Sequence, residues 1–508
     1  MTTFNSVKRP GGPDASKSRP GGWLDHWEPE DPEFWQQVGA GVARRNLVVS
    51  ILTDHFGFCV WVVWTVVVIN LGDAGLPMSL SEQFVLTLVP NLVGSVLRIP
   101  YSFAVPRFGG RAWTTISGLV LLVPALLLAV VVPSRWLAHQ AHGTQFWVLL
   151  ACAATAGVGG ANFASSMANI SFFYPERIKG YALGLNAAGG NLGVAVCQLA
   201  VPVVIVIGVP SGALKLAHHQ VHLAYAGWLW VPFVLLTAAA AWRYMDSLSQ
   251  ARADHRSYLM AVKDRHTWML SLLYTGTFGS FIGYSFALPL VIKSSFPSFL
   301  HSHPFIATYL GGLGFLGAAV GSLSRPAGGW LADRYGGAQV TVAMFAAMAV
   351  FTGLAIASVD HRDFGLFLAS FVVIFGFTGM GNGSIYKLIP TVFAARALSP
   401  LSHGGDPAGA AVELKRRAAA AIGVAGAFGA LGGVGVQVVL RQASLHVSAL
   451  EKAARTPALK DAVAAAHSAW STPALWAFLV SYLVLGSVTW VVYLHRRSFR
   501  TVLAGAAG

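Results

Sequence analysis

Five ionisable side chains stand inside long apolar stretches of this sequence. They are Asp54, His55, Arg98, Arg325 and Lys387, and Arg98 is the only charged residue of "NLVGSVLRIPYSF". A guanidinium group keeps its charge in any protein environment, whereas carboxyl, imidazole and amine groups can gain or lose a proton. The arginines are therefore suited to holding an anion, and the other three to carrying a proton.

The four charged residues of this set share one spacing. Each lies nine residues from a basic residue at the end of its stretch: Asp54 from Arg45, Arg98 from Arg107, Arg325 from Arg334 and Lys387 from Arg396. Nine helical residues rise about 13 Å, close to half of a hydrocarbon core of roughly 30 Å. A charge at that depth costs about 3 kcal/mol on insertion scales. We therefore expect four helices to bring these groups to one layer near the membrane midplane, around a shared cavity.

The composition predicts an integral membrane protein made of helices. The chain has 508 residues, of which 55% are hydrophobic and 11% are charged, against roughly 25% charged residues in soluble domains. Apolar runs long enough to span a bilayer predict twelve transmembrane helices, at 46–71, 80–105, 112–133, 145–173, 180–208, 224–244, 267–292, 307–331, 338–358, 364–394, 418–440 and 474–494.

The net charge of +14 follows the predicted topology rather than a nucleic-acid site. With a cytoplasmic N-terminus, and with Arg243 at the end of its span counted as cytoplasmic, 23 of the 34 lysines and arginines fall on the cytoplasmic side, 8 outside and 3 within spans. This asymmetry is the positive-inside rule, which places both termini in the cytoplasm. We expect no nucleic-acid partner.

The spans predict five regions. Residues 1–45 form a partly disordered cytoplasmic segment, 46–244 an N-terminal six-helix half, 245–266 a cytoplasmic linker, 267–495 a C-terminal six-helix half and 496–508 a cytoplasmic tail. The stretch 441–473 is expected to be an exterior excursion.

Cys59, Cys152 and Cys197 are scattered within spans and predict neither a disulfide framework nor a metal site. No nucleophile–base set or phosphate loop is visible, so we expect no enzyme, no catalytic residue and no cofactor.

The two halves contain an internal repeat. A shift of 227 residues places Arg98 on Arg325. The same shift aligns Gly94 with Gly321, Ser95 with Ser322, Arg107 with Arg334, Phe108 with Tyr335, and Gly109-Gly110 with Gly336-Gly337. Such repeats are typical of secondary transporters, whose substrate site lies near the midplane between the halves. A central ligand could then meet both arginines.

The surroundings of the arginines allow two interpretations. Tyr274 and Phe278 are four residues apart and share a helix face, and Phe163 stands among small residues, so these rings could wall a site or belong to the core. Asn191 and Asn382 could bind a ligand or bond across helices. Asp54 could pair with Arg98 or Lys387 and lock helices together.

The second copy of the repeat continues as "GWLADRYGG", which resembles the loop signature of the major facilitator superfamily. Asp333 and Arg334 belong to this signature and are expected at the cytoplasmic surface. There they could latch helix ends together in one state, a gating role, or form a solvated turn.

Longer motifs resemble the bacterial nitrate/nitrite porter family of this superfamily. They include "LRIPYSFAVPRFGGRAWT", "GANFASSMANISFFYP", "GLNAAGGNLGVAVCQL" and "SRPAGGWLADRYGG". The resemblance implies a fold of two pseudo-symmetric six-helix halves and an anion held by the paired arginines. It assigns Arg98, Arg325, Phe163, Tyr274, Phe278 and Asn191 to substrate binding. One departure is that Ala187 and Ala188 stand where relatives often have glycine.

The family includes nitrate/nitrite exchangers and proton-coupled nitrate importers. "DHFGFCVW" and "GNGSIYKLIP" resemble the proton-linked members more, which makes Asp54, His55 and Lys387 candidates for coupling. We therefore expect an alternating-access nitrate/nitrite carrier of the bacterial cytoplasmic membrane, monomeric, with proton-coupled import favoured over exchange. A porter for organic or phosphorylated anions and a transporter-like nitrate sensor are the alternatives. The sensor would need a signalling domain, for which 496–508 is too short.

Overall fold

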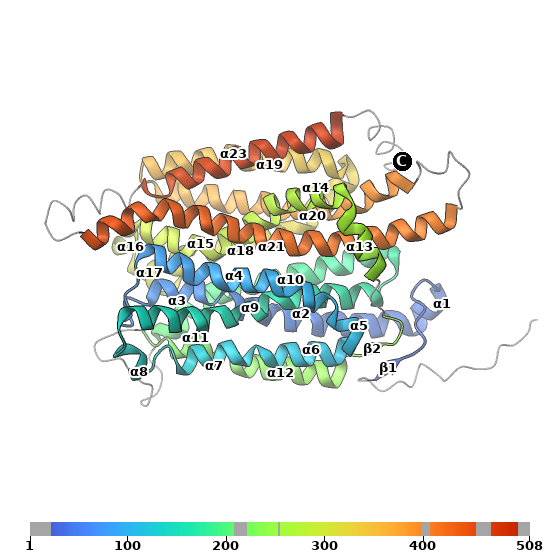
Figure 1. The fold of residues 1–508 in the computed structure, drawn as a ribbon, viewed down its shortest axis with the longest axis horizontal. Coiled ribbons are helices and arrows are strands. Elements are labelled where there is room, and N and C mark those ends of the chain that lie inside the picture. Colours follow the sequence, from blue (N-terminus) through green and yellow to red (C-terminus); the bar gives the residue numbers. More distant parts are fainter. Residues whose placement is uncertain (1–21, 208–220, 252–254, 398–406, 454–468, 496–508) are drawn as a thin grey trace, which may run out of the picture.

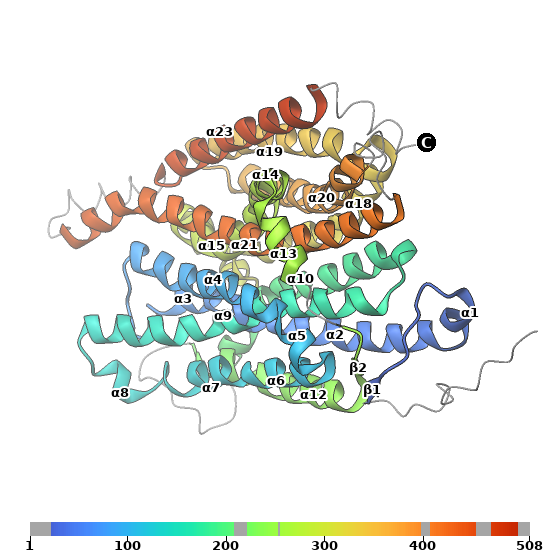
Figure 2. The same ribbon diagram turned by 45° about the vertical axis from the view of Figure 1, so that its right-hand side comes forward.

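The computed structural model describes residues 22–207, 221–251, 255–397, 407–453 and 469–495. Its long helices run side by side in two groups, one from each half of the chain (Figure 1). Figure 2 separates them, with the blue-to-green helices of the N-terminal half below and the yellow-to-red helices of the C-terminal half above. The predicted all-helical fold of two halves is confirmed.

The N-terminal half begins with the short strand β1 (Trp23–Leu24). Its helices are α1 (Pro32–Phe34), α2 (Ala40–Val62), α3 (Trp64–Asn70), α4 (Leu80–Ser102), α5 (Ala104–Phe108), α6 (Gly110–Val120), α7 (Leu122–Val130), α8 (Arg135–Ala138), α9 (His142–Phe173), α10 (Glu176–Val206), α11 (Ala224–Trp228) and α12 (Trp230–Tyr244). A π-helical turn, Trp35–Gly39, joins α1 to α2.

The connection between the halves contains β2 (Ser247–Leu248) and α13 (His255–Lys263). The C-terminal half has α14 (Arg265–Tyr274), a π-helical turn (Thr275–Gly279), α15 (Ser280–Ser295), α16 (Pro297–Ser302), α17 (Pro304–Tyr309), a 3-10 turn (Gly311–Leu313), α18 (Phe315–Tyr335), α19 (Gly337–Asp360), α20 (Phe364–Ala397), α21 (Pro407–Ala453), α23 (Thr472–Thr489) and a π-helical end (Trp490–His495).

Two ends of the molecule are distinguished below. The end that carries α1, β1, β2 and α13 is called the terminal face, and the opposite end, with α8, α16 and α17, is called the loop face (Figure 1). Eleven helical stretches of the described residues are long and apolar enough to cross a membrane. The remaining expected span is α18, a helix of 21 residues whose arginine, proline, serines and glycines make it less apolar.

The internal repeat is visible in the backbone. Helices α5 and α18 end at Phe108 and Tyr335, and the next residues, Gly109 and Gly336, have φ angles of 82° and 90°. These left-handed conformations favour glycine, which has no Cβ to clash. Each glycine then precedes a helix of its own half, so the same turn is built twice.

Equivalent contacts precede this turn in both copies. Ser95 donates to the carbonyl of Asn91 at 2.8 Å, and Ser322 donates to the carbonyl of Ala318 at 2.7 Å. A Cβ on Gly94 would lie 2.9 Å from a carbonyl oxygen of α9, and one on Gly321 would lie 2.9 Å from a carbonyl oxygen of α20. In each half, the helix that carries the arginine therefore approaches its neighbour equally closely: α4 approaches α9, and α18 approaches α20.

The first helix begins at Pro32 rather than at residue 46. Asp31 caps it by accepting a hydrogen bond from the backbone N–H of Glu33 at 2.9 Å. Proline at the first helical position is preorganised for helix and has no N–H to leave unpaired. The expected boundary at 46 was placed by the apolar run, and the capping signal before it marks the real start.

The segment before this helix packs against the N-terminal half. Trp27 and Trp35 are buried, and their rings contact Phe173 and Tyr174 at the end of α9. The indole of Trp27 also donates to the carbonyl of Phe172 at 3.1 Å. The expected disorder concerns residues 1–21, which lie outside the described residues.

The structure also corrects the expected boundaries of two spans in the C-terminal half. The expected span 307–331 is interrupted, because Gly312 and Leu313 have positive φ between α17 and α18. The expected span 418–440 belongs to α21, which continues to Ala453. Part of the expected excursion 441–473 is therefore helix, and Trp470 near its end is buried. Residues 454–468 of that excursion, like 398–406 and 496–508, lie outside the described part.

The two halves contact each other along the helix pairs α4–α21 and α10–α18. Toward the loop face further bonds join them. Lys293 donates to the carbonyl of Ile69 and lies 3.7 Å from Asp73, and Gln198 donates to the carbonyl of Ser285 at 2.6 Å. The halves are thus closed against each other on this side.

Candidate functional site

The guanidinium group of Arg98 is buried where α4 meets α9 and α21. Only 2% of the residue is exposed. Its Nε donates to the carbonyl of Gly160 at 3.1 Å, and its Nη1 donates to the carbonyl of Gly426, in the other half, at 2.9 Å. Its Nη2 has no hydrogen-bond partner among the described residues. Arg98 therefore keeps an unused donor nitrogen at the interface of the halves.

Arg325 has a corresponding arrangement on α18. It is 4% exposed, and its Nη2 donates to the hydroxyl of Tyr274 at 3.1 Å. Its Nη1 has no hydrogen-bond partner in the described part of the chain. Burying such a charge is costly unless its donors are used, so this second unused nitrogen also points to a ligand.

Aromatic rings bring the two arginines to one place. The Phe278 ring centre lies 5.3 Å from Cζ of Arg98 and 6.0 Å from Cζ of Arg325. Phe278 stacks on Tyr274 at 5.2 Å and on Phe163 at 6.1 Å, and Phe163 also lies 4.8 Å from Cζ of Arg98. All five residues predicted to form the arginine–aromatic site therefore lie together.

Two further rings were not predicted from the sequence. The ring of Tyr386 lies 4.9 Å from Cζ of Arg325, and that of Trp61 lies 5.5 Å from Cζ of Arg98. Tyr386 precedes Lys387 in "GNGSIYK" and is four residues after Asn382. The two residues share a helix face, and this spacing could have predicted Tyr386 as part of the site. Trp61 had no comparable signal within its aromatic-rich stretch.

Asp54 is buried in a hydroxyl-lined cavity of the N-terminal half. It is 1% exposed, and its Oδ2 accepts a hydrogen bond from Ser166 at 3.4 Å. Within the described residues, Oδ1 has no hydrogen-bond partner and no ion pair joins Asp54 to Arg98 or Lys387. The cavity is lined by Ser50, Thr53, Asp54, Thr114, Ser117, Asn162, Ser165 and Ser166. In the described residues Asp54 therefore joins helices through Ser166 rather than through an ion pair.

The glycine run of α10 packs directly on Asp54 and His55. A Cβ on Gly190 would lie 2.7 Å from Oδ2 of Asp54. His55 Nδ1 lies 3.0 Å from the carbonyl of Gly189, which can only accept, so Nδ1 carries the proton. Asn186 of the same run donates to Ser166 at 2.5 Å. Two of the candidate coupling groups, Asp54 and His55, are thus joined to this helix by direct contacts.

Lys387 does not lie in the central layer. Its side chain is 52% exposed and forms an ion pair with Asp333, with 2.5 Å between Nζ and Oδ1. The expectation of four charges at one depth is therefore wrong for Lys387, because the end of α18 supplies a carboxylate beside it. Arg334 lies over the ring of Tyr335 at 5.5 Å. The ion pair joins the ends of α18 and α20.

Asn191 is buried on α10, and its Oδ1 has no hydrogen-bond partner among the described residues. Among the described residues, no hydrogen bond joins it to the arginine pair. Asn382 is also buried with an unpartnered Oδ1. Both amides are available for a ligand, and their part in the site stays a prediction.

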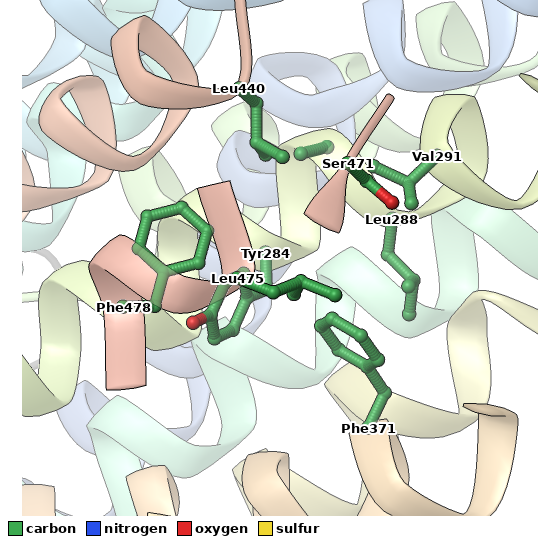
Figure 3. Close-up of a pocket in the computed structure, with 9 residues that line it drawn as sticks. Tyr284, Leu288, Val291, Phe371, Leu440, Ser471, Leu475 and Phe478 are labelled. Atoms are coloured by element: carbon green, nitrogen blue, oxygen red, sulfur yellow. The ribbon is translucent and has the colours of Figure 1, made fainter. Parts of the chain in front are cut away.

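A separate cavity lies in the C-terminal half, between α15, α20, α21 and α23 (Figure 3). Its lining residues are Tyr284, Ala287, Leu288, Val291, Phe371, Leu440, Ser471, Leu475 and Phe478. The walls are mainly apolar and include none of the predicted site residues. This cavity does not suit an anion.

Comparison with known proteins identifies the superfamily and relatives of this chain. Residues 46–436 match the model of the Major Facilitator Superfamily. The chain is 39% identical to the nitrate/nitrite transporter NarU of Salmonella typhimurium, over 81% of this chain and 87% of that protein. It is 35% identical to NarU of Escherichia coli, over 93% and 96%. It is 36% identical to the probable nitrate/nitrite antiporter NarK2 of Thermus thermophilus, over 75% and 85%.

Solved structures share the fold at low sequence identity. A bacterial homolog of the human lysosomal transporter Spinster, in an inward-facing and occupied conformation, superposes with a TM-score of 0.60 at 15% identity, covering 90% of this chain and 97% of that one. A D-xylose–proton symporter superposes with a TM-score of 0.58 at 15% identity, covering 88% and 97%.

Proposed function

We propose that this chain, which belongs to the nitrate/nitrite porter family of the major facilitator superfamily, holds nitrate or nitrite between Arg98 and Arg325 and carries it across the membrane by alternating access. The observation that carries the proposal is the unused guanidinium nitrogen on each arginine, at the junction of the two halves. A small oxyanion can accept a hydrogen bond from both. Rocking of the two halves would then expose the bound anion to one side of the membrane or the other and allow its release.

The charge and shape of the site support a small planar anion. Two guanidinium groups and one carboxylate, Asp54, leave a single net positive charge, which one monovalent anion neutralises. Guanidinium is a planar set of donors suited to flat oxyanions, and Phe163 and Phe278 provide flat walls.

Substitution by lysine tests the arginine pair. Arg98→Lys and Arg325→Lys keep the charge but lose the fork of donors, and a hydrogen bond to a charged group contributes about 1.5–3 kcal/mol. We expect nitrate uptake at low nitrate to fall at least about tenfold in proteoliposomes with equal protein content. Arg107→Lys, at the exposed residue nine positions after Arg98, is the matched control. Normal uptake by both central variants would overturn the assignment.

A porter for organic or phosphorylated anions is the alternative to exclude. The same two basic groups could bind such anions, but the site between stacked rings favours small ones. Competition of nitrate uptake with nitrite, phosphate and dicarboxylates separates the two. We expect nitrite alone to compete at concentrations similar to nitrate.

We also propose that nitrate import is coupled to protons through Asp54. Its carboxyl group is buried, has an unpartnered oxygen and faces a cavity lined by hydroxyl groups that can relay a proton. Its contact with Gly190 ties its state to α10, a helix that packs on the other half. Lys387 is too exposed to share this role.

Imposed gradients separate proton coupling from exchange. We expect an acidic exterior to drive nitrate uptake into vesicles without internal nitrite, Asp54→Asn to abolish this stimulation, and Lys387→Met to retain it. Uptake that requires internal nitrite and ignores the pH gradient would establish exchange instead.

The orientation is part of the proposal. The excess of lysine and arginine supports an orientation with the terminal face in the cytoplasm and the loop face outside, in the bacterial cytoplasmic membrane. Asp333, paired with Lys387, and Arg334 would then act as a cytoplasmic gating group that holds the ends of α18 and α20 together.

A further inference from the structure

Helices α4 and α21 form an antiparallel seam between the two halves, called here the α4–α21 seam. Arg98 bonds to the carbonyl of Gly426 at one point. Seven residues away on both helices, Asn91 packs on Gly433, where a Cβ would lie 2.7 Å from Nδ2 of Asn91. The seam therefore runs from the arginine site toward the loop face.

Two residues of this seam have amide groups that are wholly unpaired. Asn91 and Gln437 are each 0% exposed, and all four of their amide atoms lack hydrogen-bond partners within the described ranges. Gln437 follows Gly433 by one helical turn and shares its face. One further turn on, the Nε of Arg441 is also buried without a partner in the described residues. A line of unused polar groups thus leads from Arg98 to the loop face.

Helix packing alone does not account for these amides. Buried polar groups in proteins are nearly always hydrogen-bonded, and an amide adds nothing to packing that leucine or methionine would not. The other seam, α10–α18, provides a contrast. There Gln198 donates to Ser285 at 2.6 Å and to Thr65 at 3.3 Å, so its amide nitrogen joins helices. The amide oxygen of Gln198 is unpartnered, but in the part of the chain that the structure describes neither amide atom of Asn91 or Gln437 forms such a bond.

We propose that Asn91 and Gln437 form a second, outer anion subsite, which receives nitrate or another small oxyanion when the α4–α21 seam opens at the loop face. The proposal rests on the proposed anion transport. The amide N–H groups donate to the anion, and Arg441 at the outer end of the seam attracts it. Seven helical residues separate Asn91 from Arg98, a step of about 10 Å.

Neutral donors suit this position. A stepping site must bind an anion strongly enough to draw it in and weakly enough to release it onward. Amide groups give hydrogen bonds without a full charge, whereas the arginine pair supplies permanent charge at the end of the path. The anion would therefore move from weaker to stronger binding as it enters.

A charge series at position 437 tests the subsite. Whole cells or oriented vesicles carrying Gln437→Lys, Gln437→Leu or Gln437→Glu are assayed for the external nitrate concentration that gives half-maximal uptake. We expect this concentration to fall for lysine, to rise about tenfold for leucine and to rise further for glutamate. Gln442, exposed on the same helix, is the matched control, and its three equivalent variants should match the wild type.

Stability separates a binding role from a structural one. Gln437→Leu removes an unpaired buried amide, so its thermal unfolding temperature should equal or exceed that of the wild type while its uptake weakens. Equal half-saturation across the charge series, or losses that simply follow lowered stability, would overturn the subsite. Absence of nitrate uptake by the wild type and all Gln442 variants would instead overturn the proposed function.

Thiol labelling gives a second measurement. Gln437→Cys should react with a membrane-impermeant anionic thiosulfonate added at the loop face, and nitrate should slow the reaction. The native cysteines are buried and should remain unmodified. Labelling that nitrate leaves unchanged would contradict an anion at this position.

Discussion

At the scale of single residues, the site depends on how a few hydrogen bonds orient the two guanidinium groups. Arg98 is held by carbonyl oxygens from both halves, so its orientation depends on their relative position. Arg325 donates to the phenol of Tyr274, and the ring of Tyr386 lies 4.9 Å from its Cζ. The two arginines are equivalent in the repeat, but their supports differ.

Tyr274→Phe should therefore weaken the site through Arg325. The variant keeps the ring stack and removes the acceptor that orients Nη2, and a hydrogen bond to a charged group contributes about 1.5–3 kcal/mol. We expect the nitrate concentration for half-maximal uptake to rise about tenfold or more. Tyr284→Phe, whose hydroxyl bonds to Tyr482 away from the site, should leave it unchanged. Equal values for both variants would contradict the role of Tyr274.

The sequence identified the central residues better than it identified their partners. The repeat and the nine-residue spacing paired Arg98 with Arg325, and both guanidinium groups lie beside the ring of Phe278. The same spacing misplaced Lys387, because depth was measured from Arg396 and the carboxylate of Asp333 could not be foreseen beside it. Spacing along one helix predicts depth, whereas an ion pair depends on the neighbouring helix.

At the scale of helices, backbone contact between small residues sets how closely the site walls approach. Within the C-terminal half, Gly279 of the π-helical turn crosses Gly432 of α21. A Cβ on Gly279 would lie 2.7 Å from Cα of Gly432, nearer than real Cβ contacts allow. Because Phe278 directly precedes Gly279, this crossing also positions the Phe278 ring, which lies beside both arginines.

Gly279→Ala should therefore force the two helices apart. Overpacking of a tight core costs about 1–3 kcal/mol, and we expect a thermal unfolding temperature several degrees lower in detergent, with weaker nitrate uptake. Gly435→Ala is the control on the same helix, because nothing lies within 4 Å of its Cβ position. Alanine there should maintain or raise stability through its helix propensity. Equal unfolding temperatures for both variants would disprove the close crossing.

Apolar runs predicted which helices exist and missed where several of them end. Helix α21 continues to Ala453 and the first helix begins at Pro32, since a helix can extend past its membrane-facing residues. The break at Gly312 was missed for a related reason. Hydropathy averages over a window and does not detect the φ angle of one glycine.

At the scale of the molecule, bonds between the two halves at the loop face favour a state that is closed on that side. Lys293 bonds across the halves to a carbonyl of α3 and lies near Asp73. The partly exposed ion pair contributes little, so the bond to Ile69 is the main contribution. These bonds hold the halves together at the loop face, while the arginine pair itself is buried, with Arg98 2% and Arg325 4% exposed.

Lys293→Ala should move the population toward the state that is open at the loop face. Loss of about 1 kcal/mol corresponds to a several-fold shift, and the labelling rate of Gln437→Cys from the loop face should rise by that factor. Lys179→Ala, which removes an ion pair within one helix, should leave the rate unchanged. An unchanged rate in Lys293→Ala would exclude this residue as a latch.

The parallel pairing of β1 with β2 has a consequence for biosynthesis. Trp23–Leu24 can pair with Ser247–Leu248 only after the ribosome has made the whole N-terminal half. Asp246 closes the same junction by binding Arg45 at 2.6 Å and Asn46 at 2.9 Å. Domains generally fold in the order of synthesis. The N-terminal half can therefore complete its own folding, with its first and last segments joined, before the helices that contact Arg98 from the C-terminal half are synthesised.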